Sequence, residues 1–169
     1  MAIDMYSASV PMMLQMLGNM LAWLDKAQAH AEARRFSPDN YLGLRLAPDM
    51  LPFAKQVQIA SDNAKGCVAR LAGLEIPKYE DTETTLDELR ARIRKTIDFV
   101  KSVPAEKFAG AEGRAIEIPQ RNRDPLKFDG ENYLRHFAIP NFMFHVTMTY
   151  ALLRHAGVEL GKVDFLRAA

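Results

Sequence analysis

Four stretches of this sequence repeat apolar residues every three or four positions, the spacing of an α-helix that buries one face. The clearest stretch covers about residues 86–100, and its charged residues lie off the apolar stripe. Thr85 and Glu88 stand at its start with the spacing of a capping box, which satisfies free N–H groups in the first turn. The stripe itself consists of Leu86, Leu89, Ile93, Ile97 and Val100.

The other three helices are expected at about residues 9–35, 49–71 and 131–156. Asp49 is the candidate N-cap of the second helix, with Pro52 in its first turn. Pro140 should kink the last helix or split off a short leading turn, because proline cannot donate a helical hydrogen bond. Two alternating stretches around a polar turn in residues 102–129 predict a small β-hairpin. The expected fold class is therefore all-α, a four-helix bundle in a single domain over residues 1–169, with the hairpin before the fourth helix.

The charge balance argues against nucleic-acid binding. The chain has 22 basic and 21 acidic residues in 169, a formal net charge of +1, whereas nucleic-acid binders normally carry a clustered basic excess. The densest basic run comprises Arg90, Arg92, Arg94 and Lys95. In a chain of neutral total charge we interpret that run as a solvated helix face.

The N-terminus and the lone cysteine favour a cytoplasmic protein. Asp4 lies near the start, no basic residue precedes Lys26, and polar residues interrupt the apolar run, so neither a secretory signal nor a membrane span is expected. Cys67 has no second cysteine with which to form an internal disulfide. It lies in an apolar stretch, so a buried, inert thiol is expected rather than a nucleophile.

A candidate site combines polar residues from two helices. Asn141 and His145 are four residues apart and project from the same inward face of the last helix. Gln58 lies on the inward stripe of the second helix, and Asp62 follows one turn later. If these faces meet, the core holds an imidazole, two amides and a nearby carboxylate, either as a metal or ligand site or as a buried hydrogen-bond network. Amide oxygens bind transition metals weakly, so a divalent transition metal is possible but its absence is the expectation.

The final helix, NFMFHVTMTYALLRHAGVELG, resembles the last helix of the DinB/YfiT-like superfamily. Members typically show His-x-x-x-His followed by Leu-Leu-Arg-x-x-Gly. Asn141 occupies the first histidine position and His145 the second, while the ending matches at Leu152, Leu153, Arg154 and Gly157. The segment QVQIASDNAKGCVARLAG is similar to the superfamily's second helix, with Gln58 at the place of its remaining histidine.

Nearly the whole chain is more closely similar to an uncharacterised bacterial branch, domain of unknown function 1993. The segments that carry this likeness are MYSASVP, RLAPDMLPFAKQVQIASDNAKG, EDTETT and HFAIPNFMFHVTMTYALLRHAGVELGKVDFL. The resemblance implies a DinB-like bundle with a long crossover between helices two and three. DinB-like relatives include metalloenzymes and metal-dependent thiol transferases with a three-histidine site, of which only His145 is present here.

Two functions remain open at this stage, and the sequence identifies no substrate or small-molecule ligand. The first is a degenerate metal or small-ligand site in which His145 is the one strong ligand or a general base. The second is a non-catalytic, metal-free, homodimeric binding protein. Met12, Met16 and Met20 lie off the main stripe of the first helix, and a helix apolar on more than one face suggests a subunit interface.

Overall fold

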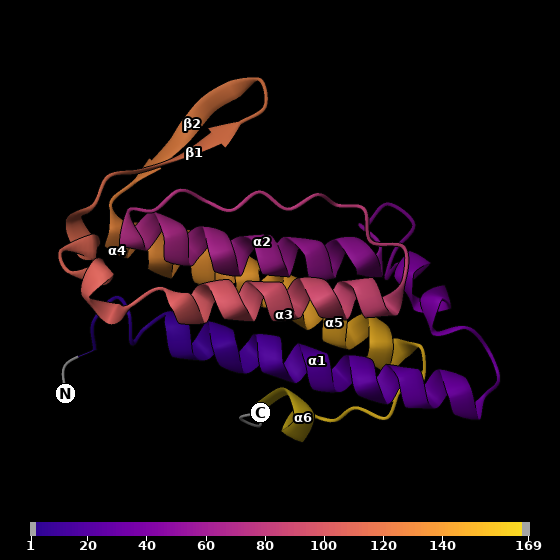
Figure 1. Cartoon of the computed structure of the whole chain (residues 1–169). Helices are drawn as coiled ribbons and strands as arrows, with labels where there is room; N and C mark the ends of the chain where they lie inside the picture. Colours follow the sequence, from indigo (N-terminus) through magenta and orange to yellow (C-terminus); the bar gives the residue numbers. More distant parts are fainter. Residues whose placement is uncertain (1–2, 167–169) are drawn as a thin grey trace.

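The computed structural model describes residues 3–166 and consists mostly of helices (Figure 1). Four long helices lie side by side: α1 (Val10–Ala33), α2 (Phe53–Ala72), α3 (Leu86–Ser102) and α5 (Ile139–His155). We call these four helices the helical body. Short helices α4 (Gly130–Tyr133) and α6 (Lys162–Leu166) lie at its margins, and strands β1 (Ile116–Gln120) and β2 (Arg123–Phe128) form an antiparallel hairpin that projects from it. The predicted helical class and the small hairpin are confirmed.

The directions of the long helices require one long connection. In Figure 1, α1 and α5 run one way and α2 and α3 run the other, so the chain after α2 must return along the body before α3 begins. Residues 73–85 make this crossover without regular secondary structure. No helix within residues 3–166 is both long and apolar enough to cross a bilayer.

The helix boundaries follow local signals in one case and depart from them in another. The Thr85–Glu88 capping box is confirmed: Glu88 N donates to Thr85 Oγ1 at 3.2 Å, and Thr85 N donates to Glu88 Oε2 at 3.0 Å. Asp49 as N-cap is wrong, because α2 begins four residues later, at Phe53, with Pro52 as its N-cap. A turn at Ala47–Met50 places Asp49 outside the helix.

The predicted helix at 131–156 is divided into α4, a π-helical turn (Leu134–Ala138) and α5. Ile139 N donates to the Leu134 carbonyl, five residues back, just before Pro140 in the first turn of α5. Pro140 has no N–H to donate, and the wider π turn before it accommodates the proline ring. The chain therefore remains helical through the proline.

The second apolar face of α1 is covered by the chain's own C-terminal helix. Asn19 Nδ2 donates to the Phe165 carbonyl at 2.8 Å, and Trp23 Nε1 donates to the Asp164 carbonyl at 3.1 Å. Met16 and Met20 are buried, and Met12 is partly buried. The expectation of a subunit interface on this face of helix one therefore loses its basis, because α6 packs there.

Ion pairs to the almost fully buried guanidinium of Arg92 hold the crossover against α2 and α3. The side chain of Arg92 on α3 is 2% exposed and forms ion pairs with Asp62 of α2 (2.9 Å) and with Asp81 (3.0 Å) and Glu83 (2.8 Å) of the crossover. Its Nη1 also donates to the Glu80 carbonyl at 3.1 Å. Burial opposes ionisation, but the bond to Glu83 and the three carboxylates outweigh it and raise the pKa of Arg92.

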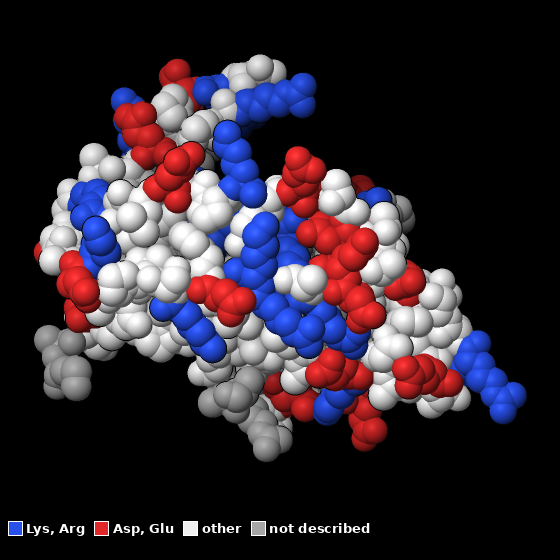
Figure 2. Space-filling model, viewed as in Figure 1, with Lys and Arg blue, Asp and Glu red and all other residues white. Residues whose placement is uncertain are grey.

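The interpretation of the basic run as a solvated face is wrong for two of its members. Arg90 and Arg92 are buried, because α3 turns them toward acidic groups and carbonyls of other elements, while Arg94 and Lys95 are exposed. On the face shown in Figure 2, basic side chains at the middle of the body adjoin acidic side chains on both sides.

Replacing Arg92 should destabilise the protein. Arg92→Leu leaves Glu83, which is 11% exposed, without a cationic partner, while Asp62 and Asp81 keep Lys65 and Lys55. We expect a loss of about 3 kcal/mol in the free energy of unfolding, the lower end of the range for a broken buried pair. Urea denaturation measures it, with Arg94→Leu on the exposed side of α3 as the matched control. Equal losses in the two variants would contradict the fastening role of Arg92.

Candidate functional site

The structure separates the four predicted site residues into two pairs on different sides of α2. Gln58 and Asp62 face the crossover and α3: Gln58 Nε2 donates to Glu83 Oε2 at 2.7 Å, and Asp62 pairs with Arg92 and Lys65, each at 2.9 Å. These bonds belong to the fastening of the crossover. Among the described residues, no hydrogen bond or ion pair joins Gln58 or Asp62 to His145, where the sequence led us to expect that they meet.

His145 instead meets Gln56, two positions earlier on α2. The ring Nδ1 lies 2.8 Å from Gln56 Oε1, and Gln56 Nε2 donates to the Leu51 carbonyl at 2.9 Å. A carbonyl oxygen can accept a hydrogen bond from the Gln56 amide nitrogen but not from the amide oxygen, so the nitrogen faces the Leu51 carbonyl and the oxygen faces the ring. His145 Nδ1 must therefore carry the hydrogen. The imidazole is thereby fixed in one tautomer, with the lone pair on Nε2.

Asn141 forms a second amide contact one helical turn away. Asn141 Nδ2 donates to Asn63 Oδ1 of α2 at 2.9 Å. Gln56 and Asn63 are seven residues apart on α2, and His145 and Asn141 are four apart on α5, so the two antiparallel helices match two pairs across one seam. We call Gln56, Asn63, Asn141 and His145 the α2–α5 seam.

The seam favours a neutral imidazole. His145 is 9% exposed, and burial lowers its pKa below the ordinary 6.5. Its Nε2 makes no hydrogen bond to any residue in the described part of the chain, and Asn63 Nδ2 is a buried donor with no acceptor there. The ring is partly covered by Phe144, whose centroid lies 5.2 Å away. What the seam offers chemically is one acceptor lone pair and one unsatisfied amide donor.

These residues do not fit the three-histidine metal centre of DinB-like relatives. The lone pair of His145 Nε2 is the one nitrogen donor at the seam, the Gln56 oxygen already accepts from the ring, and the unsatisfied Asn63 group is an N–H donor that cannot ligate a cation. Among residues 3–166, no three His, Cys, Asp or Glu side chains gather as a metal site. We derive no reaction step through a metal.

Cys67 is the buried, inert thiol that its sequence context predicts. It is 0% exposed in the core, and burial raises its pKa to about 12. A thiol that stays protonated near neutral pH does not act as a nucleophile or a metal ligand.

Comparison with known proteins gives the chain a family. The family model for a domain of unknown function, DUF1993, matches residues 5–166. The chain belongs to the DUF1993 family. It is also similar to the crystal structure of a DinB family member protein from Shewanella denitrificans, at 42% identity over 97% of this chain and 92% of that chain, with a TM-score of 0.87. No curated protein matches.

Two members of the seam in this DUF1993 chain, Gln56 and Asn63, were missed in the sequence. Their signal is the seven-residue spacing of two amides, which repeats on one side of α2 just as Asn141 and His145 share one side of α5. The stripe of apolar residues on α2 is broad enough to be centred on either side. Gln58 and Asp62, four residues apart, also share one side of the helix. In the structure the crossover lies on the Gln58 side of α2, and the Gln56 side faces α5.

Protein purified without an affinity tag should contain far less than one transition-metal ion per chain, because the seam offers too few donors. Elemental mass spectrometry measures this, and added Zn²⁺ or Ni²⁺ should leave Tm unchanged. The His145→Ala variant is the comparison. Near-stoichiometric metal in the native protein that disappears in this variant would contradict the assignment.

Protonation of His145 should weaken the fold below neutral pH. The unfolded chain takes up this proton near the ordinary pKa of 6.5, whereas the folded protein takes it up only at lower pH. The free energy of unfolding should therefore fall as pH drops from about 6.5 toward the lowered folded pKa. Urea titrations of the native protein and of His145→Gln measure the difference.

His136→Gln is the control for this experiment, because His136 is exposed on the π turn. It should keep the native pH dependence, and His145→Gln should reduce it. If both variants behave alike, burial of neutral His145 does not contribute to the acid sensitivity.

Proposed function

We propose that this protein is a metal-independent, non-catalytic binding protein that acts as a homodimer of four-helix bundles. The observation that carries the proposal is the outer face of α5. No Lys, Arg, Asp or Glu occurs between Arg135 and Arg154, on the outer face or the inner one. A helix that is uncharged all round is normally covered on all sides.

The outer face of α5 carries a stripe at helical spacing. Pro140, Phe144 and Thr147 are exposed and Ala151 is partly exposed, with Phe144 at 51%. The backbone carbonyl of Leu51 accepts a hydrogen bond from Gln56, which also contacts His145 of α5. Leu51 is 47% exposed, so it places a second apolar side chain near this face. We call Pro140, Phe144, Thr147, Ala151 and Leu51 the α5 patch.

A second copy of the chain is the partner that suits this patch. A two-fold interface places the same surface on both sides, so a surface that lacks charged side chains meets itself without like-charge repulsion. The chain has nearly equal numbers of acidic and basic residues, so the two copies carry no large net charge to separate them. These features support self-association more directly than the methionines of α1 do.

A residual small-ligand function at His145 is the second candidate. It is supported by the Nε2 lone pair and by the unsatisfied amide N–H of Asn63, whose oxygen accepts from Asn141, one turn from His145 on α5. Together these groups suit a small polar molecule with one donor and one acceptor. His145 also borders Phe144, so such a molecule would lie at the edge of the α5 patch.

Introducing a charge at the centre of the α5 patch should dissociate the homodimer. Phe144→Arg places a guanidinium where two copies would meet, and desolvating two like charges opposes association. Size-exclusion chromatography with light scattering should give twice 19.0 kDa for the native protein and 19.0 kDa for the variant. Leu46→Arg, at a residue 49% exposed outside the patch, is the matched control and should remain dimeric.

Two outcomes would overturn this proposal. A native protein that is monomeric across the accessible concentration range removes the homodimer. A dimer that survives Phe144→Arg but is lost in Leu46→Arg places the interface elsewhere.

A further inference from the structure

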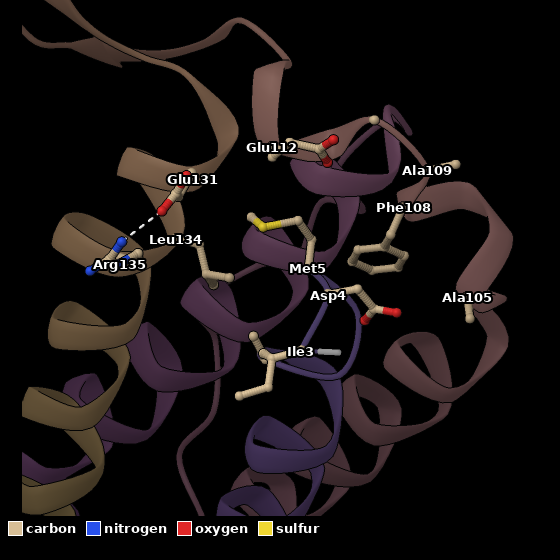
Figure 3. Close-up of a pocket in the computed structure, with 12 residues that line it drawn as sticks. Ile3, Asp4, Met5, Ala105, Phe108, Ala109, Glu112, Glu131, Leu134 and Arg135 are labelled. Atoms are coloured by element: carbon tan, nitrogen blue, oxygen red, sulfur yellow. Dashed lines mark hydrogen bonds and ion pairs between the residues drawn. The ribbon is translucent and has the colours of Figure 1, made fainter. Parts of the chain in front are cut away.

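A cavity of about 610 Å³ lies at the end of the helical body where α3 ends and α4 begins, and no residue of the α2–α5 seam lines it (Figure 3). Three separate parts of the chain line it, and it is open to solvent: the N-terminal turn before α1, the 3-10 turns at Ala105–Phe108 and Ala111–Gly113, and the α4–π-turn junction. Its volume is within the range of about 300–1,000 Å³ that small-molecule sites occupy.

The walls of the cavity are mainly apolar. Met5, Phe108 and Leu134 border one open space in Figure 3, with Ala105 and Ala109 beside Phe108. Phe108 is held in place by an edge-to-face contact with Tyr6, whose ring centroid lies 5.3 Å away. The walls therefore offer a preformed surface to an apolar group.

Two backbone features lie next to the cavity. A Cβ at Gly130 would lie 1.7 Å from the Ala111 carbonyl oxygen, so only glycine lets α4 pack this closely against the 3-10 turn at Ala111–Gly113. Leu134 and Arg135 line the cavity from the π-helical turn. Single π turns inside helices are rare and frequently occur at functional sites.

The rim carries an excess of carboxylates. Asp4, Glu112, Glu131 and Arg135 contribute the charged groups, and Arg135 already pairs with Glu131 at 2.6 Å. Hydrogen bonds from the Ser7 backbone N–H and hydroxyl lower the pKa of Asp4, so this carboxylate is ionised near neutral pH. Asp4 and Glu112 therefore leave two negative charges at the rim that Arg135 does not neutralise.

We propose that this cavity binds a primary amine that carries an apolar group. The apolar group occupies the space between Met5, Phe108 and Leu134, and the ammonium lies at the rim beside Asp4 and Glu112. A carboxylate or phosphate ligand is disfavoured, because the same rim repels it. This site is independent of the α5 patch and of the oligomeric state.

Three probes with the same apolar group distinguish the contribution of the ammonium from that of the apolar group. 2-Phenylethylamine, 2-phenylethanol and 3-phenylpropionate share a phenyl group and differ in charge. Titrations of the ¹⁵N-labelled full chain, followed by NMR, should show amide shifts at 105–113 and 131–135 with the amine. The amine should bind at least about tenfold more tightly than the alcohol, and the carboxylate should bind more weakly than the alcohol.

Variants test the two halves of the site. Glu112→Gln should weaken amine binding by about fivefold, the effect of one partly exposed ion pair. Glu106→Gln, an exposed carboxylate of the neighbouring turn that does not line the cavity, should leave it unchanged. Ala109→Trp should fill the space and abolish binding of the amine and the alcohol.

The proposal is overturned if the alcohol binds as tightly as the amine or the carboxylate binds best. It is also overturned if amine-induced shifts map outside the cavity, or if none appear up to about 20 mM amine, where a millimolar site would be largely filled. Equal affinities in Glu112→Gln and Glu106→Gln would remove the rim from the site.

Discussion

The ion pairs of Arg92 are the constraint on which the arrangement of this protein depends. They join α3 to α2 and to the crossover, which has no regular secondary structure. Bonds from α2 to Pro77, Asp81 and Glu83 hold the same segment along the body. The same contacts set the rotation of α2. Because Gln58 and Asp62 are drawn toward Glu83 and Arg92, the opposite side of the helix, with Gln56 and Asn63, faces α5. The composition of the α2–α5 seam is thus decided on the far side of α2.

The sequence predicts what is local and fails where a distant segment decides. The capping box of α3 and the hairpin turn involve residues within a few positions of each other, so the spacing of these residues in the sequence is sufficient to predict both features. The choice between Gln56 and Gln58 depends on a crossover 25 residues away and could not be read from the helical period, which both residues satisfy. Arg92 shows the same limit. A basic residue in a charged stretch has the pattern of a solvated face, and only the position of three carboxylates reveals that it is buried.

The seam lies where the resemblance to DinB-like proteins implies part of a three-histidine site, with His145 as the one histidine present. Here one amide–amide pair, Asn63–Asn141, and one amide–imidazole pair, Gln56–His145, join α2 and α5. Neutral hydrogen bonds of this kind each contribute about 1 kcal/mol, much less than a structural metal. The core around Trp23, Phe53 and Phe142 is fully buried, and the Arg92 ion pairs hold the crossover. The neutral form of His145 is the one that the seam favours, because burial lowers its pKa.

The two helices with excess apolar surface differ in what covers them. On α1 the excess is covered by α6, to which side chains of α1 donate hydrogen bonds at the carbonyls of Asp164, Phe165 and Leu166. On α5, Phe144 remains 51% exposed within the described residues. Burying a large apolar side chain fully contributes about 1.5–3 kcal/mol, while association costs about 4–15 kcal/mol in lost freedom of motion. Two copies of Phe144, each already half buried, therefore contribute too little for a tight dimer. In the proposed homodimer, Leu51, Pro140 and the small residues Thr147 and Ala151 would have to pack closely as well, so we expect the proposed self-association to be reversible and to depend on concentration.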